Sequence, residues 1–254
     1  MAAPTQPRVS RVVDQIFEAS KSLPINYNDG IGWGVDAYKM YRGDGSTAAG
    51  WPSLSEWVSY QQMFDYNAND MKQACTNLGL QSGYDTTDDE IAMIWNGIDE
   101  AATKSGVDHR FILAIMMQES KGCVRIWTTK NANPNPGLMQ DHDGPNTCNS
   151  YGSLEKPCPQ SGISGMIQDG VGGTTSGDGL AAYLTQVVQR AKNVNIANVD
   201  GGNSQIYYQA ARLYNSGKVE YSDLGVAYSS TPCYASDIAN RLTGWMFAPS
   251  QCTL

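Results

Sequence analysis

The sequence has few charged residues and no long apolar run, and both absences narrow the class of protein. Charged residues make up 17% of its 254 residues, whereas about 25% is usual for a soluble domain. The 17 Lys and Arg residues against 25 Asp and Glu give a net charge of −8, which disfavours binding of nucleic acid through a basic surface. The longest apolar run, 111–117, has seven residues, and a membrane helix needs about 20. We therefore expect neither a nucleic-acid partner nor a membrane segment.

Histidine is scarce as well, which limits the chemistry that the chain can carry out. The two histidines are His109 and His142, and no two of the six cysteines form a Cys-x-x-Cys pair, so a zinc site is not expected. The sequence has no Gly-x-Ser-x-Gly motif and no Gly-rich loop ending in Lys-Ser or Lys-Thr. A calcium loop at Asp141 and Asp143 lacks Gly and Glu at the EF-hand offsets. We expect no metal and no organic cofactor.

The six cysteines are an even number at wide spacings, which is typical of a disulfide-bonded secreted protein. They are Cys75, Cys123, Cys148, Cys158, Cys233 and Cys252. We expect two or three disulfides and an extracellular location, with six buried free thiols as the alternative; the spacing does not select a pairing. The first residues lack the apolar core of a signal peptide, as in a mature secreted chain with an added initiator Met.

Apolar spacing predicts a mainly helical chain without an internal repeat. Capping-box pairs at Ser53–Glu56 and Thr87–Glu90 open two of the predicted helices. Residues 26–52 and 123–179 are rich in Gly, Asn and Asp, and we expect irregular structure there; so long a stretch is usually functional or contains short strands. The predicted helices are one around 9–17, one after Ser53 through Phe64, one from Met71 to Leu78, one from 87 to about 106, and then 109–121, 178–193, 203–216 and 233–246.

The helix predicted from His109 to Lys121 is apolar on nearly all sides, so we expect it to be the buried central helix. Glu119 lies near its end, on the same face as Ile112 and Ile115. A carboxyl group desolvated in that position would have a raised pKa and stay protonated near neutral pH, as a general acid must. The alternative is that Glu119 is the first solvated residue where the helix leaves the core.

Four short motifs occur in the order found in goose-type lysozymes and soluble lytic transglycosylases, and the chain resembles that family over roughly residues 86–246. The motifs are Gln118–Ser120 (Gln-Glu-Ser), Gly137–Gln140 (Gly-Leu-Met-Gln), Tyr214–Gly217 (Tyr-Asn-Ser-Gly) and Cys233–Tyr234. The resemblance implies a mainly α, lysozyme-like fold. In this interpretation residues 86–254 form the catalytic domain, and residues 1–85 are a helical extension packed on it within a single domain.

The resemblance also implies roles for individual residues. Glu119 would be the catalytic acid, and Gln140 with the backbone after Gly137 would contact the substrate, because Gly permits close approach. The other substrate-binding candidates are Ser120, Thr128, Met139, Tyr214, Asn215 and Tyr234. Two positions depart from the family pattern: Leu213 replaces the Ala before Tyr-Asn, and Thr128 stands where the transglycosylases have Ser.

A second carboxylate would decide between two mechanisms. An inverting hydrolase needs a base that activates water, whereas the transglycosylases use the acetamido group of the substrate. Asp141 and Asp143 are the candidate bases, with Asp141 slightly favoured because it directly follows Gln140. If neither is the base, Asp169 and Asp178 are the next to test. Goose-type enzymes place the Asp at the position of His142. Both Asp residues are equally consistent with a simple loop turn before Gly144 and Pro145.

Together with the cysteine content, the resemblance therefore implies a secreted, monomeric muramidase that cleaves β-1,4 bonds between N-acetylmuramic acid and N-acetylglucosamine in peptidoglycan. The acidic net charge would weaken long-range attraction to an anionic cell wall. Three alternatives stay open: a relative that cleaves chitin or chitooligosaccharides, a lytic transglycosylase that releases 1,6-anhydro products, and a non-catalytic wall-binding protein.

Overall fold

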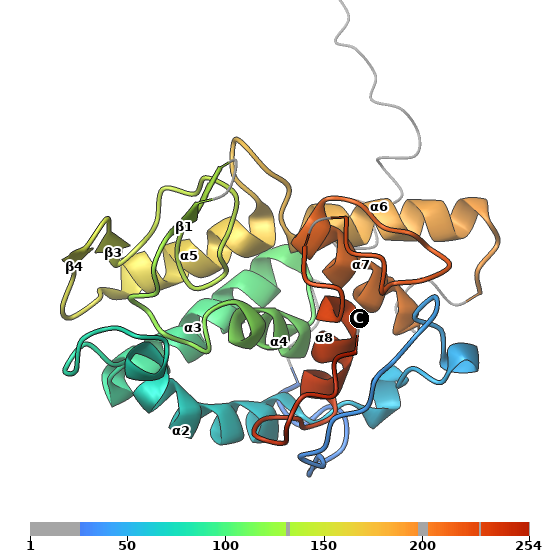
Figure 1. Ribbon diagram of the computed structural model, residues 1–254, viewed down its shortest axis with the longest axis horizontal. Coiled ribbons are helices and arrows are strands. Elements are labelled where there is room, and N and C mark those ends of the chain that lie inside the picture. The colour runs from blue at the N-terminus through green and yellow to red at the C-terminus, as the bar shows by residue number, and fades with distance from the viewer. Residues whose placement is uncertain (1–25, 131–132, 198–202, 229, 254) are drawn as a thin grey trace, which may run out of the picture.

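The computed structural model describes residues 26–130, 133–197, 203–228 and 230–253, and these are mainly helical, as predicted (Figure 1). The helix expected around residues 9–17 lies outside the described residues. None of the described helices has the length and apolarity to cross a membrane. The α-helices are α2 (Tyr60–Asn77), α3 (Asp88–Ser105), α4 (His109–Glu119), α5 (Gln160–Gly172), α6 (Leu180–Asn193), α7 (Gln205–Ser216) and α8 (Tyr234–Leu242).

Helix α4 is the centre of the fold, as its sequence predicts. Every side chain from His109 to Met117 is buried. Asp108 caps the helix by accepting a hydrogen bond from the Arg110 amide, and a second cap at Ser120 ends it two residues earlier than expected. The helix packs against α2, α3 and α8. Packing on three sides therefore fixes the position of Glu119, the last residue of α4, at the edge of the core.

The two capping boxes are both present, but they begin different structures. The Thr87–Glu90 box opens α3, which ends at Gly106 with φ 73°, as predicted. The Ser53–Glu56 box opens only a 3-10 helix, η2 (Leu54–Glu56). The chain then runs extended to Ser59, because the Val58 amide donates to Leu242 O and the Ser59 amide to Ile31 O. Tertiary hydrogen bonds thus override the helix predicted through 57–59.

Two further differences from the predicted helices have physical causes. The stretches predicted to end at Phe64 and to begin at Met71 belong to one unbroken helix, α2, whose buried face includes both residues. Helix α5, not expected from the sequence, contains four glycines, which have low helix propensity. Glycine also lets it lie close to its neighbours: a Cβ on Gly170 would come within 2.3 Å of Met139 Cβ, and one on Gly97 of α3 within 2.8 Å of Ile167.

The rest of the described chain between 123 and 179 is irregular apart from two small antiparallel hairpins, which agrees with the prediction for this segment. Strand β1 (Thr129–Lys130) pairs with β2 (Pro134–Asn135), and β3 (Asn149–Ser150) pairs with β4 (Ser153–Leu154). Residues 26–52 are also largely irregular, with one short 3-10 helix, η1 (Thr47–Ala49). The three remaining predicted helices are present as α6, α7 and α8, the last of them shorter than expected.

All six cysteines are paired, which confirms the expectation of disulfides. The pairs are Cys75–Cys123, Cys148–Cys158 and Cys233–Cys252. The first joins α2 to the segment after α4, and the second joins the residue before β3 to the chain before α5. The third fixes the start of α8 to the C-terminal segment.

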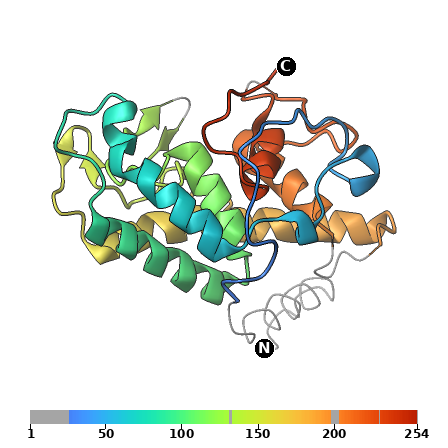
Figure 2. The ribbon, with the colours of Figure 1, turned by 90° about the horizontal axis from the view of Figure 1, so that it is seen from below.

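The helices gather into two groups with α4 between them (Figure 1). The hairpins, α3 and α5 lie on one side, and α6, α7 and α8 lie on the other; Figure 2 shows the same division from below. One apolar core runs through both groups and includes side chains from Trp51 to Leu242. The two groups supply the two walls of the site.

Candidate active site

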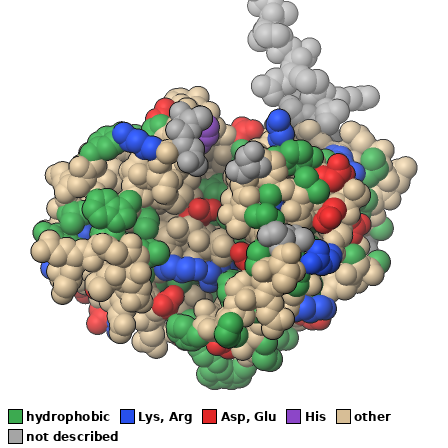
Figure 3. All heavy atoms as spheres, in the orientation of Figure 1, with side chains coloured by type: hydrophobic (Ala, Val, Ile, Leu, Met, Phe, Trp, Pro, Cys, Tyr) green, Lys and Arg blue, Asp and Glu red, His purple; other side chains and the backbone are tan. Residues whose placement is uncertain are grey.

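A pocket of about 900 Å³ opens between the two groups of helices, beside the end of α4. Figure 3 shows this face of the molecule hollowed near its centre. Residues of α7 and of the loop before α8 line one side, including Tyr214, Asn215 and Thr231. Loops around Gln140 and Thr174 line the other. We call these sides the helical wall and the loop wall.

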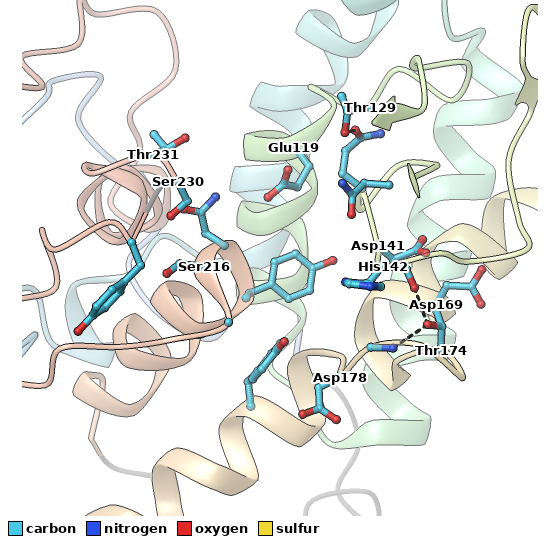
Figure 4. Close-up of a pocket in the computed structure, with 18 residues that line it drawn as sticks. Glu119, Thr129, Asp141, His142, Asp169, Thr174, Asp178, Ser216, Ser230 and Thr231 are labelled. Atoms are coloured by element: carbon cyan, nitrogen blue, oxygen red, sulfur yellow. Dashed lines mark hydrogen bonds between the residues drawn. The ribbon is translucent and has the colours of Figure 1, made fainter. Parts of the chain in front are cut away.

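Glu119 lies between the two walls, with Thr231 and Ser230 on one side of it and Asp141 on the other (Figure 4). Burial raises the pKa of its carboxyl to about 7, although the Tyr234 hydroxyl and the charge of Lys121 both act to lower it. Desolvation disfavours the ionised form of a carboxyl group. A substantial fraction of Glu119 is therefore protonated at neutral pH, as the sequence analysis predicted.

Tyr234, which does not line the pocket, fixes the Glu119 carboxyl by a hydrogen bond. Its hydroxyl donates a hydrogen bond to Glu119 Oε1, and its ring is buried at the first turn of α8. The guanidinium of Arg212, from α7, lies 5.9 Å from the centre of that ring. Arg212 also donates to Thr231 O (2.9 Å), Pro232 O (3.1 Å) and the side chain of Asn215. One buried cation therefore joins α7 to the chain that enters α8.

The loop wall is attached to the helical wall and to the β1–β2 hairpin by hydrogen bonds. The Tyr214 hydroxyl donates to Met139 O at 2.8 Å. Gln140 accepts from the Thr129 hydroxyl at 2.9 Å and donates to Trp127 O at 3.2 Å, and its φ is 47°. With its amide used in this way, Gln140 shapes the wall, and its remaining surface faces the pocket.

Asp141 lines the pocket but is 4% exposed, and burial with the nearby charge of Asp169 raises its pKa to about 7. Neither carboxylate oxygen accepts a hydrogen bond of standard geometry from the described residues, although the Gly144 amide lies near enough to offset part of the pKa shift. The side chain packs directly on Gly144, where a Cβ would come within 1.9 Å of Asp141 Oδ1. The site thus contains two carboxyl groups whose pKa lies near 7.

The other predicted site residues surround the pocket without lining it. Ser120 is fully buried and donates to Met116 O. Met139 is buried too, and its carbonyl is the acceptor for Tyr214. Gly137 has φ 73°, and a Cβ there would meet Met166 at 2.7 Å. Asp143 is exposed and accepts from Ser176 at 3.0 Å. Thr128 lies half-buried beside the β1–β2 hairpin.

Several residues that line the pocket were not among the predicted site residues. They come from α5 and the loops beside it, from the first turn of α6 and from the chain before α8, and include His142, Asp169, Thr174, Asp178, Tyr183, Ser230 and Thr231. Thr174 is fixed by donating to His142 O. No motif marks these positions, since long-range contacts bring them together; Asp169 and Asp178, carboxylates of a Gly-rich segment, were expected only as the next bases to test after Asp141 and Asp143.

Within the described part of the chain, no group of three or more His, Cys, Asp and Glu side chains could hold a metal ion. The acidic residues near the pocket do not gather around a common point: Asp169 accepts from the Asn146 side chain at 2.7 Å, and Asp178 from Gln186 at 3.0 Å. The groups at the pocket that could take part in a reaction are the carboxyl groups of Glu119 and Asp141, tyrosine hydroxyls and side-chain amides.

Comparison of the chain with models of known protein families, with curated proteins and with solved structures gives no match.

Proposed function

We propose that the protein is a glycoside hydrolase of the lysozyme or muramidase type, which cleaves β-1,4 bonds between N-acetylmuramic acid and N-acetylglucosamine with Glu119 as general acid. The observation that carries the proposal is the Glu119 carboxyl, with a pKa of about 7, at the edge of a pocket large enough for several sugar rings. An acid with a pKa near the working pH transfers its proton most effectively. The four motifs in family order support the same assignment.

In the proposed mechanism Glu119 protonates the oxygen of the glycosidic bond as that bond breaks. Tyr234 donates a hydrogen bond to the carboxyl and stabilises the carboxylate that remains. Asp141, on the loop wall, removes a proton from the attacking water, and its pKa near 7 suits a base at neutral pH. An acid and a base on opposite sides of the sugar would invert the anomeric centre.

A second mechanism is favoured by one observation, the burial of both Asp141 oxygens against Gly144. A base in that state does not reach a water molecule in the pocket unless the loop wall moves. The substrate's own acetamido group would then attack the anomeric carbon as the glycosidic bond breaks, as in lytic transglycosylases. The C6 hydroxyl of the same sugar would next displace the acetamido oxygen and give its proton to the Glu119 carboxylate, so the product would be a 1,6-anhydro sugar. Glu119 remains the acid in both mechanisms.

Product masses test the proposal. The protein is incubated with purified peptidoglycan and with chitohexaose, and the soluble products are analysed by mass spectrometry. Hydrolysis gives products with a normal reducing end, and transglycosylation gives products lighter by one water. Cleavage of chitohexaose alone would indicate the chitin-cleaving alternative, and binding to peptidoglycan without cleavage would indicate a wall-binding protein.

We also propose that the protein is secreted. Three disulfides persist in an oxidising compartment and are rare in the cytosol. Peptidoglycan and chitin are both met outside the cytoplasm, so the expected substrate and the expected compartment agree.

A further inference from the structure

Lys121, next to the proposed acid, has no hydrogen-bond or ion-pair partner among the described residues. It follows Glu119 by two residues and has a left-handed backbone conformation with φ 55°. Its side chain is only partly exposed, and it makes no hydrogen bond or ion pair with any residue that the structure describes. Burial and the nearby charge of Arg241 lower its pKa to about 8. An unpaired, partly desolvated ammonium costs folding free energy, so its position needs an explanation.

Arg241 is the second cation of this cluster. It comes from α8, is 5% exposed, and its Nε donates to Gln118 Oε1 at 2.8 Å. Its guanidinium lies over the Trp245 ring, 4.7 Å from the ring centre. No described carboxylate lies within ion-pair distance of it. The planar guanidinium is thus fixed by neighbours that leave its charge without a counter-ion.

The nearest acidic groups are already occupied or do not reach these cations. Asp237 accepts hydrogen bonds from the Tyr38 hydroxyl at 2.6 Å and from Gln118 Nε2 at 3.1 Å. Asp237 raises the pKa of Lys121 and of Arg241 only by electrostatic attraction without direct contact, and Asp70 does the same. Gln118 therefore joins Arg241 to Asp237 and keeps the two charges apart. The donors of the Lys121 ammonium remain available to a ligand.

The cluster adjoins the pocket at Glu119 without lining it. Lys121 lies near enough to Glu119 to lower its pKa, and Arg241 lies near Tyr234, the hydrogen-bond donor to Glu119. Figure 3 shows Lys or Arg atoms in the hollow near the centre of this face, close to acidic side chains. A polymer cleaved at Glu119 extends past the acid in both directions. The part that leaves the pocket would therefore pass the partly exposed Lys121 and the small exposed part of Arg241.

We infer that Lys121 and Arg241 form a binding site for a carboxylate of the substrate, beside the bond that is cleaved. This inference rests on the proposed function and narrows its substrate class to an acidic aminosugar polymer. N-acetylmuramic acid carries a lactyl carboxylate on the sugar itself, whereas chitin is neutral. The lysine supplies a point charge, and the arginine supplies paired donors that match a carboxylate. A local positive site also explains how a chain of net charge −8 could select an anionic polymer.

Binding of a single sugar tests the site without any need for turnover. The ligands are N-acetylmuramic acid and its lactyl carboxamide, which differ in charge but hardly in shape and contain no bond for the enzyme to cleave. Affinities are measured by NMR titration at pH 7 and low salt for the wild type, Lys121→Met, Lys121→Arg and Lys104→Met. Lys104 is exposed at the end of α3, so its variant has the same net charge as Lys121→Met.

We expect the wild type to bind the acid about tenfold more tightly than the amide, which corresponds to about 1.4 kcal/mol. Lys121→Met should remove this preference, while Lys121→Arg and Lys104→Met should keep it. Equal affinities for the two ligands in the wild type, no binding of either, or an unchanged preference in Lys121→Met would overturn the site. A wild type that prefers the acid yet leaves peptidoglycan intact would support the site and contradict the proposed function.

Discussion

The two walls of the pocket are built in different ways. The helical wall presents Tyr214 and Asn215 from the last turns of α7, and Tyr234 stands behind it in α8. The loop wall presents Gln140 and Asp141 from irregular chain, held by hydrogen bonds to side chains and to backbone carbonyls. The acid belongs to a third element, the end of the buried helix α4.

The difference concerns what fixes each carboxyl group. Glu119 is fixed by a helix whose core-facing residues are all buried and by a hydroxyl from a second helix. Asp141 depends on a turn with positive φ at Gln140 and Asp143 and on close packing with Gly144. Chain of this kind opens locally at lower free energy than packed helices. We therefore expect the acid to be rigid and the candidate base to depend on movement of the loop wall.

The largest effect is expected at the rigid carboxyl. Glu119→Gln keeps the size and the hydrogen bonding of the side chain but removes the transferable proton. Activity on peptidoglycan, measured by release of soluble fragments, should fall about 100-fold or more. Glu100→Gln, at an exposed position of α3, is the control and should keep full activity. A Glu119→Gln enzyme with most of its activity would exclude Glu119 as the acid.

The same variant has a defined effect on stability. The pKa of Glu119 is about 7 in the folded protein, above its ordinary value of 4.5. Ionisation therefore costs folding free energy as the pH rises from about 4.5 through 7, and the glutamine variant avoids this cost. At pH 8 the free energy of unfolding of Glu119→Gln should exceed that of the wild type by about 1–3 kcal/mol, and its melting temperature should be higher. At pH 4 the two proteins should have nearly the same stability. Thermal melts at the two pH values measure the difference.

The next largest effect separates the two mechanisms at the loop wall. If Asp141 is the base, Asp141→Asn should lose nearly as much activity as Glu119→Gln, because water then lacks its activator. Asp143→Asn is the matched control: Asp143 is exposed, and its loss should change activity less than twofold. If both variants stay active and the products are 1,6-anhydro sugars, the acetamido mechanism holds. If both stay active with normal reducing ends, the base lies elsewhere, and Asp169 and Asp178 are the next residues to test.

Replacing two of the disulfides tests whether the loop wall is less rigid than the helical wall. Cys148–Cys158 closes a short loop next to the loop wall, and Cys75–Cys123 ties α2 to the segment after α4. From their separations of 10 and 48 residues, replacing each pair by Ser should cost about 3 and 4 kcal/mol of stability. We expect the first replacement to raise KM several-fold and the second mainly to lower Tm. Equal changes in KM would show that the loop wall does not depend on its own disulfide.

The smallest effect is a shift of the pH profile. The Tyr234 hydroxyl stabilises the Glu119 carboxylate and so lowers its pKa. Tyr234→Phe should therefore move the alkaline limb of kcat/KM, which reports ionisation of the acid, about 1 pH unit higher. Tyr214→Phe is the control, since its hydroxyl bonds to Met139 O in the loop wall. An alkaline limb that moves equally in both variants would contradict a specific role of Tyr234.

The sequence alone determined the features that depend on local periodicity and composition. The apolar run from Phe111 to Met117 required a buried helix, and the position of Glu119 at its end followed from the helical repeat. The Thr87–Glu90 capping box and Gly106 set the two ends of α3. The even number of cysteines predicted disulfides, and all three pairs are present.

Only the tertiary structure decided the features that depend on contacts between distant residues. The extended chain at Trp57–Ser59 follows from hydrogen bonds to residues 31 and 242, and the helix at 160–172 follows from close packing of its glycines. The site also depends on distant residues. Asp141 and Asp169 are 28 positions apart in the sequence, and only the fold brings them close enough for the charge of Asp169 to raise the pKa of Asp141. A pKa depends on burial and on neighbouring charges, and a linear pattern specifies neither across such distances.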